Sequence, residues 1–368
     1  MHGVRKDQIT FTRFIAAIAI VIFHSGSAVF PFNHESVSFI LVNANIGVSY
    51  FFTLSGFIMM LAYGSNDVMN IQKYYKSRFA RIAPSYYLAL LLVLPFILQK
   101  WAEYDYLGLF LNITMLQAWV PSKVLSINAP GWSVSVEMLF YLLFPWLFNF
   151  VYQKQRLWLI FVGGAVFFLA SQWLHQALLD ADYSDGFGTA THNLIYFFPL
   201  MHLNEFVMGN IAGMFFMRYM SQRRRANGPW IILSIVALLV ILKFPIGISM
   251  HNGLLVVVFI PLILFIAADN GIFSRLMSLR PLVFLGEISF GIYILQMPFA
   301  NIFYRILLRY GITDMSLIFY AYLCMLCLLA GLSFKFIETP LRKRINAFRS
   351  ASENPLPPAG PAAYRSPA

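Results

Sequence analysis

The chain has 368 residues, of which 60% are hydrophobic and only 11% are charged, against about 25% charged residues in ordinary soluble domains. Because these few charged side chains cannot cover a surface that faces water, the composition excludes a soluble globular protein. It predicts an integral membrane protein. With only two cysteines, a disulfide scaffold is excluded as well. A formal net charge of +11 would suggest nucleic acid in a soluble chain. In a membrane protein such charge first reports orientation, and we expect no nucleic-acid partner.

Apolar stretches of the length needed to cross a bilayer, about 20 residues, recur along the sequence. They predict an all-α, polytopic membrane protein with about ten transmembrane helices. The expected spans are 9–30, 47–63, 83–98, 134–151, 157–173, 199–217, 230–243, 254–268, 283–303 and 317–336. The interval 107–117 is too short for a span and predicts an interfacial or re-entrant piece.

The distribution of basic residues predicts the orientation of these spans. With a cytoplasmic N-terminus and ten spans, most of the 26 Lys and Arg residues fall in cytoplasmic segments, as the positive-inside rule requires. We therefore expect both termini in the cytoplasm. Residues 1–345 are expected to form the membrane domain, and the Pro-, Ala- and Ser-rich segment 346–368 a disordered cytoplasmic tail.

Two ionisable residues in the first span suggest a ligand path, because charged side chains within a bilayer usually mark a cavity or a pathway. Arg13 and His24 are 11 residues apart, which places them on one helix face and about 16 Å apart along its axis. In the predicted orientation Arg13 lies near the cytoplasmic edge and His24 in the outer half of the membrane. Such a stripe suits a long anionic donor, for example an acyl-coenzyme A whose head stays in the cytoplasm.

A pair of arginines precedes the third span. Arg78 and Arg81 are three residues apart and therefore share a helix face. Guanidinium groups bind phosphate through paired hydrogen bonds, so the pair is a candidate donor-binding site. The alternative interpretation is that Arg78 and Arg81 only set the orientation of the helix at the membrane edge.

Acidic residues also fall within expected spans, each of which could equally be a paired structural group. Glu137 and Glu205 enter the fourth and sixth spans from outside, at the expected depth of His24. A carboxylate beside a histidine can orient it as a general base. Glu287 enters the ninth span from the inside and is expected near the head of the donor.

Five segments of the chain resemble, in order, the acyltransferase-3 family of bacterial integral-membrane acyltransferases, which includes exopolysaccharide and O-antigen O-acetyltransferases. The matching segments are FTRFIAAIAIVIFHSG, GVSYFFTLSGFIMM, RFAR, GWSVSVEMLFYLLFP, and FLGEISFGIYILQMP together with FIETPLRKR. The chain departs from the family at Gln296, where many relatives carry a histidine. A glutamine cannot act as a base, so we expect no catalytic role for it.

The resemblance implies a multi-pass protein of the bacterial inner membrane that transfers an acyl group, acetyl in the first instance, from cytoplasmic acyl-coenzyme A to a hydroxyl of an exported or lipid-linked polysaccharide. Acyl-coenzyme A would be a co-substrate, with no bound cofactor and no metal, and envelope-glycan synthesis proteins could be partners. The expected site comprises His24 and Glu137 as catalytic residues, Arg13, Arg78 and Arg81 as donor-binding residues, and Trp132, Ser133, Glu205 and Glu287 as acceptor-binding or supporting residues. The alternative function is a secondary transporter that uses the same intramembrane residues; a non-catalytic scaffold is a third interpretation.

Overall fold

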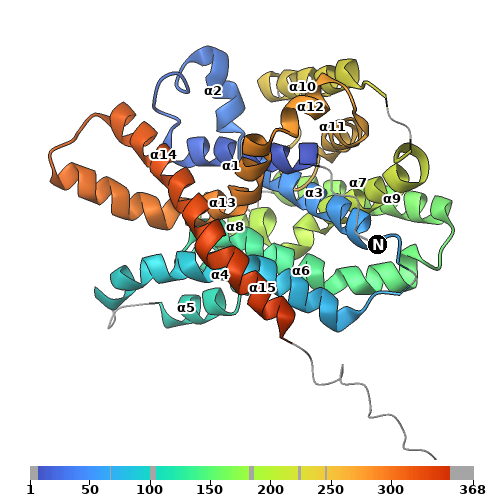
Figure 1. The fold of residues 1–368 in the computed structure, drawn as a ribbon, viewed down its shortest axis with the longest axis horizontal. Coiled ribbons are helices and arrows are strands. Elements are labelled where there is room, and N and C mark those ends of the chain that lie inside the picture. The colour runs from blue at the N-terminus through green and yellow to red at the C-terminus, as the bar shows by residue number, and fades with distance from the viewer. Residues whose placement is uncertain are drawn as a thin grey trace, which may run out of the picture.

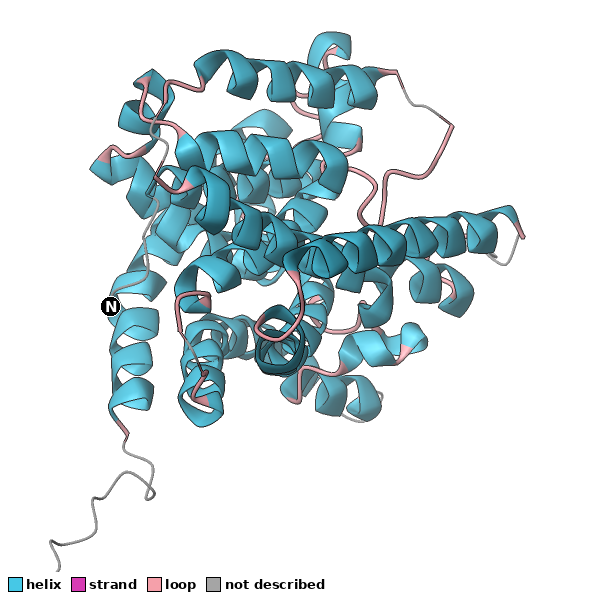
Figure 2. Cartoon of the chain, turned by 90° about the vertical axis from the view of Figure 1, so that its right-hand side faces the viewer, coloured by secondary structure: helices cyan, strands magenta, loops and turns pink. Residues whose placement is uncertain are grey.

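The computed structural model describes residues 7–66, 68–99, 105–181, 186–222, 225–244 and 247–348. Within these residues the chain forms helices and no β-strand (Figures 1 and 2), so the expected all-α class is confirmed. Seven helical segments are long and apolar enough to cross a membrane. They are α1 (Asp7–Ser25), α3 (Ile46–Tyr63), α4 (Ile71–Gln99), α6 (Trp132–Trp146) with its flanking turns, α7 (Leu157–Asp180), α13 (Arg280–Arg309), and α14 (Met315–Ser333) with α15 (Thr339–Ala347).

The other three expected spans form shorter helices: α9 (Leu203–Phe215), α10 (Gly228–Lys243) and α11 (Val256–Ala268). A 3₁₀ turn at Pro199–His202 and a π turn at Phe216–Met220 extend α9 at its two ends. Four further helices are too short to cross a bilayer: α2 (Glu35–Val42), α5 (Tyr106–Ile113), α8 (Ala190–Phe197) and α12 (Ile272–Met277). Seven spans are thus supported by length and composition, whereas the count of ten and the direction of the termini stay predictions.

Helix α4 begins at Ile71, a full three turns before the expected start of the third span at residue 83. The span was expected to begin at residue 83 because the apolar stretch begins there. The helix instead continues through both Pro84 and Pro95. The segment with Arg78 and Arg81, expected as a helical part of the cytoplasmic connection ahead of the span, is therefore part of the same helix as the span.

Glycines allow the central helices to approach each other closely, as small residues do in membrane bundles. A Cβ atom added to Gly56 of α3 would overlap the Phe206 carbonyl of α9, and one added to Gly209 of α9 would overlap the Thr53 carbonyl of α3. Gly286 of α13 meets the Thr10 carbonyl of α1 in the same way. These contacts pack α3 against α9 and α1 against α13 (Figure 1).

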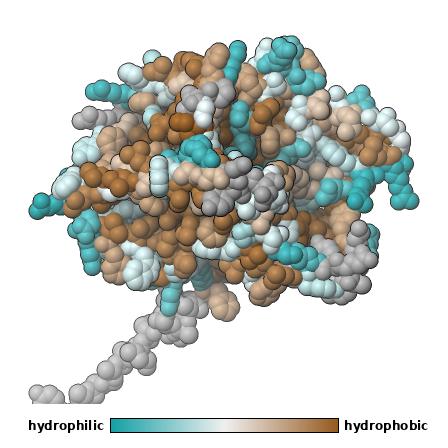
Figure 3. Space-filling model, turned by 180° about the vertical axis from the view of Figure 1, so that it is seen from behind, coloured by the Kyte–Doolittle hydropathy of each residue, from teal (hydrophilic) through white to brown (hydrophobic). Residues whose placement is uncertain are grey.

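Large apolar side chains are exposed along the outer helices. On α7 they include Trp158, Val162, Val166, Leu169 and Trp173, and apolar residues cover much of the face in Figure 3. A water-soluble protein rarely exposes such a continuous apolar surface. The outer face is therefore suited to contact with lipid.

The segment between α4 and α6 folds back into the bundle. It consists of α5 and three 3₁₀ turns, as expected of a re-entrant piece, and its Asn128 side chain is buried. Pro298 has no N–H and so leaves the carbonyl of Ile294, four residues earlier in α13, without its helical donor. Asn128 Nδ2 donates to that carbonyl at 3.0 Å, which anchors the segment and starts α6 inside the bundle.

At the C-terminus, α15 packs against α4 and ends at Ala347. The helix therefore includes the first two residues of the expected tail, 346–368. Residues 349–368 lie outside the described part of the chain.

Candidate functional site

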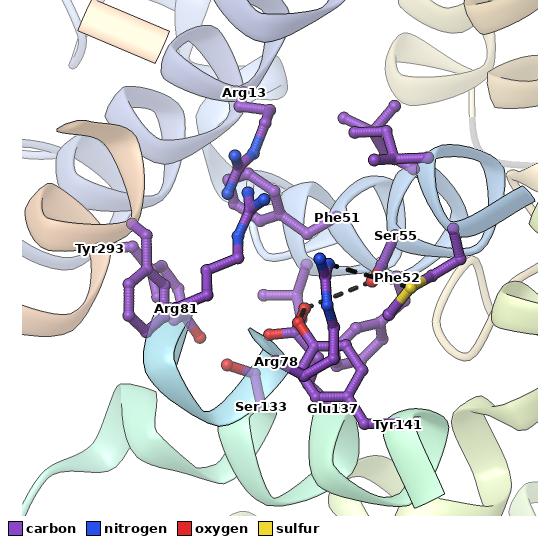
Figure 4. A pocket seen from close by; sticks show the side chains of 15 residues that line it. Arg13, Phe51, Phe52, Ser55, Arg78, Arg81, Ser133, Glu137, Tyr141 and Tyr293 are labelled. Carbon is purple, nitrogen blue, oxygen red and sulfur yellow. Dashed lines mark hydrogen bonds between the residues drawn. The ribbon is translucent and has the colours of Figure 1, made fainter. Parts of the chain in front are cut away.

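Five helices, α1, α3, α4, α6 and α13, enclose a small cavity of about 70 Å³ at the centre of the bundle (Figure 4). Its wall is apolar on the α3 side, where Phe51, Phe52 and Met59 face it. The polar side chains that line it are Arg13, Ser55, Arg78, Arg81, Ser133, Glu137, Tyr141 and Tyr293. The structure therefore brings together the three arginines and one of the glutamates singled out in the sequence.

Arg78 is held by aromatic rings and retains unused hydrogen-bonding capacity. Its guanidinium carbon lies 5.7 Å from the ring centre of Tyr63 and 6.0 Å from that of Tyr141, and Nη1 contacts the Met59 sulfur at 3.9 Å. Its Nε is buried and has no hydrogen-bond partner among the described residues. Because buried donors are almost always paired in native proteins, this group is available to a ligand in the cavity.

Arg13 of α1 and Arg81 of α4 point toward one another across the cavity (Figure 4), close enough to interact electrostatically. Two positive charges in a membrane interior repel each other, and an anion bound between them would offset that cost. Arg78 and Arg81 are three residues apart on α4, and both therefore lie on the side of that helix that faces the cavity. The arrangement therefore favours a phosphate-bearing ligand.

Glu137 is fixed by two hydroxyl groups. Tyr141, one turn later on α6, donates to Glu137 Oε1 at 2.6 Å, and Ser55 of α3 donates to the same oxygen at 3.3 Å. The cavity thus contains one carboxylate against three guanidinium groups, which leaves an excess of positive charge. Tyr141 and Ser55 were not singled out in the sequence, although the four-residue spacing from Glu137 to Tyr141 could have indicated the former.

A larger cavity of about 470 Å³ adjoins the first and shares Arg13, Arg81, Glu137 and Tyr141 with it. Glu287 lines this second cavity, near the arginines, as the sequence led us to expect. Its other charged residues, Glu338 and Arg342, were missed. Both lie in the FIETPLRKR segment that carried part of the family resemblance, so that segment was the available signal.

His24 lies elsewhere, exposed near the C-terminal end of α1. It lines neither of these two cavities, and its Nδ1 is 3.0 Å from Gln296 Oε1 of α13. The expected pairing of His24 with Glu137 is therefore wrong for this structure, since Glu137 bonds to Ser55 and Tyr141. The physical reason is the re-entrant segment 105–131, which starts α6 deep in the bundle and brings Glu137 level with Arg13.

The remaining predicted residues separate into two groups. Ser133 lines the small cavity and donates to the Pro130 carbonyl at 3.0 Å. Trp132 packs its ring 5.1 Å from His202, away from the cavity. Glu205 is fully buried and bonds to Ser49 Oγ at 2.5 Å and His202 Nδ1 at 3.2 Å. This second polar cluster ties α9 to α3, and in the structure it has no contact with the arginines.

Comparison with known proteins gives the chain its family. Acyltransferase MdmB of Streptomyces mycarofaciens is 28% identical over 228 residues, which cover 57% of each chain. The O-acetyltransferase OatA of Staphylococcus aureus is 22% identical over 90% of this chain and 56% of its own length. The peptidoglycan O-acetyltransferase OatA of Listeria monocytogenes is 25% identical over 92% of this chain and 56% of its own.

The chain thus spans little more than half the length of these curated relatives. No solved structure matches it. A family model described as an acyltransferase domain matches residues 6–335, a range that contains every residue of the small cavity as well as His24 and Gln296. On this evidence the chain belongs to the acyltransferase-3 family of membrane acyltransferases.

Proposed function

We propose that the protein is an O-acyltransferase of the bacterial inner membrane that moves an acetyl group from cytoplasmic acetyl-coenzyme A to a hydroxyl of an exported or lipid-linked polysaccharide. The observation that carries the proposal is the convergence of Arg13, Arg78 and Arg81 on one cavity. An acyl-coenzyme A has phosphates that such a cluster can bind and a thioester at the far end of a long arm. Family membership supports acyl transfer over the transporter alternative.

In this reaction the arginines hold the head of the donor and His24 serves the acceptor. The His24 imidazole takes the proton of the acceptor hydroxyl as the oxygen attacks the thioester carbonyl. The new C–O bond forms, the C–S bond breaks, and the leaving thiolate of coenzyme A takes up a proton. Arg13 and His24 lie at opposite ends of one α1 face, about 16 Å apart. A donor held at the arginines must extend along α1 to react, and the side chains of Ala17, Ile20 and Val21, which are fully buried on that face, must move apart to admit it.

Glu137 receives a different role from the one expected of it. Its bonds to Tyr141 and Ser55 place a fixed negative charge among three arginines. This charge offsets the mutual repulsion of the guanidinium groups when no donor is bound. Glu137 is therefore proposed as part of the donor site rather than as the partner of the histidine.

The test is transfer of labelled acetyl groups in membranes that contain the protein and its glycan acceptor. Mass spectrometry of the glycan should show one added acetyl group per modified unit with the wild type and none with His24→Ala. Arg13→Ala and Arg81→Ala should need far higher acetyl-coenzyme A concentrations for the same labelling. Arg309→Ala is the matched control, because Arg309 is exposed at the end of α13.

Undiminished acetylation by His24→Ala would refute the catalytic role of His24. Wild-type membranes that consume no acetyl-coenzyme A, but accumulate a solute in vesicles, would instead favour the transporter. Gene neighbours that encode envelope-glycan synthesis proteins would identify the pathway partners and hence the acceptor.

A further inference from the structure

Gln296 is the hydrogen-bond partner of His24. A glutamine side chain does not itself gain or lose a proton at neutral pH. It lies on α13, fully buried, and its Oε1 is 3.0 Å from His24 Nδ1. Its Nε2 donates to the backbone carbonyl of Tyr293 at 2.8 Å. Both ends of the amide are therefore engaged.

The second bond fixes which way the amide points. A backbone carbonyl oxygen can only accept a hydrogen bond, so the group that faces Tyr293 must be the NH₂ of Gln296. The group that faces His24 must then be the amide oxygen, which also only accepts. It follows that His24 Nδ1 is the donor and carries the proton.

A neutral imidazole has a single N–H, so a proton on Nδ1 leaves Nε2 with a free lone pair. This is the tautomer in which Nε2 can accept a proton from a hydroxyl. We propose that Gln296 is a positioning residue that selects this tautomer of His24 and aims its Nε2 at the acceptor. The catalytic use of this tautomer rests on the proposed acyl transfer. The tautomer itself is inferred only from the hydrogen bonds of Gln296.

The surrounding structure holds Gln296 in place from the α13 backbone. Tyr322 of α14, fully buried, donates its hydroxyl to the Gln296 carbonyl at 2.9 Å. Asn128 binds the Ile294 carbonyl two residues earlier at 3.0 Å. The turn of α13 before Pro298 is thus bonded to two other segments, which limits rotation of Gln296 away from His24.

The first test observes the tautomer directly and needs no activity. In protein labelled with ¹⁵N at histidine, the signals of His24, assigned by their loss in His24→Ala, should report a protonated Nδ1 and an unprotonated Nε2. Gln296→Met, which keeps the side-chain length but removes the acceptor, should abolish this preference. An Nε2–H tautomer in the wild type would overturn the proposal.

The second test measures catalysis. Gln296→Met should lower kcat about 10-fold to 100-fold, by analogy with loss of the hydrogen-bond partner of a metal-bound histidine, with little change in KM for acetyl-coenzyme A. Gln296→Glu keeps the acceptor and adds a negative charge beside the imidazole, so the acidic limb of the pH–rate profile should move to higher pH by about one unit or more. Gln153→Met, at an exposed glutamine, is the control.

The outcomes separate the two proposals. An inactive wild type whose His24 carries its proton on Nδ1 would refute the proposed function and leave the positioning role of Gln296 supported. An active wild type whose Gln296→Met variant retains full kcat would overturn the positioning role alone. A Gln296→Glu variant that loses activity with an unmoved pH profile would show that Gln296 only supports the fold.

Discussion

Arg78 gives the sharpest test of donor binding, because its Nε is buried and lacks a partner among the described residues. Replacement by alanine removes the guanidinium and its contacts with the rings of Tyr63 and Tyr141. Replacement by lysine keeps the charge but removes the planar fork that binds phosphate through two hydrogen bonds. We expect Arg78→Ala to weaken binding of acetyl-coenzyme A strongly and Arg78→Lys to weaken it less.

The size of the effect follows from the bonds that are lost. A hydrogen bond to a charged group contributes about 1.5–3 kcal/mol, and about 1.4 kcal/mol changes a dissociation constant tenfold. Loss of one such bond therefore predicts a Kd for acetyl-coenzyme A that is roughly 10-fold to 150-fold higher. Arg78→Lys should fall between this value and the wild type, because the ammonium group still attracts the phosphates.

The assay compares two donors with the purified protein in detergent. Equilibrium binding is measured for acetyl-coenzyme A and for S-acetylpantetheine, which has the same thioester arm without the phosphates. Arg78→Ala should raise the Kd of the first and leave that of the second nearly unchanged. Thermal unfolding of each variant verifies that the fold is intact, and Arg309→Ala controls for loss of an exposed arginine.

Two results would refute the reasoning. Equal losses for both donors would mean that Arg78 supports the cavity without contacting phosphate. Unchanged binding of acetyl-coenzyme A by Arg78→Ala, with an intact fold, would place the donor outside the cavity altogether.

Three further predictions concern stability. Gly209→Leu should lower the free energy of unfolding by about 1–3 kcal/mol or more, measured by thermal unfolding, because its side chain would overlap the Thr53 carbonyl; Gly163→Leu, which faces open space, should not. Glu205→Gln should cost about 1–3 kcal/mol and lower the unfolding temperature without changing the Kd of acetyl-coenzyme A, since Glu205 bonds to Ser49 and His202 away from the arginines. A hydrogen bond from Lys123 lowers the pKa of Asp105 in the folded protein. The stability that this bond contributes is therefore present above about pH 4 and is lost as the pH falls through the lowered pKa of the folded state. The unfolding temperature of Asp105→Asn should lack this acid dependence.

The sequence was informative where helix geometry alone decides the answer. Eleven residues on a 3.6-residue helix predict that Arg13 and His24 share a face, and three residues predict the same for Arg78 and Arg81. Composition and hydropathy likewise predicted an all-α membrane protein. These inferences need only the local chain and no knowledge of which helices are neighbours.

Glu137 shows where such reasoning stops. Its depth was inferred from the end of an apolar stretch, on the assumption that the chain enters the membrane at its surface. The segment 105–131 instead enters the bundle and docks Asn128 on the Ile294 carbonyl, a bond between residues 166 positions apart. The carbonyl is free because of Pro298, and nothing near Glu137 in the sequence reveals it.

The start of α4 was misplaced for a related reason. The apolar stretch begins at residue 83, but α4 starts at Ile71 and continues past Pro84 while α15 packs along the helix. Tertiary packing of this kind can outweigh a proline penalty of about 3 kcal/mol. Glu338 and Arg342 were missed by the same limit, because they reach the larger cavity only through that packing.

The proposed site has two separate ends, the cavity lined by the arginines and the His24–Gln296 pair, which can be tested independently. On the α1 face that joins Arg13 to His24, the side chains of Ala17, Ile20 and Val21 are fully buried. The two ends are therefore joined in this structure by a packed seam of the bundle. One turn of α13 supports both ends, because Tyr293 lines the small cavity and its carbonyl holds Gln296. Substitutions at the arginines should change donor affinity and substitutions at Gln296 the pH dependence of transfer, so a variant that changed both quantities together would show that the two ends are coupled.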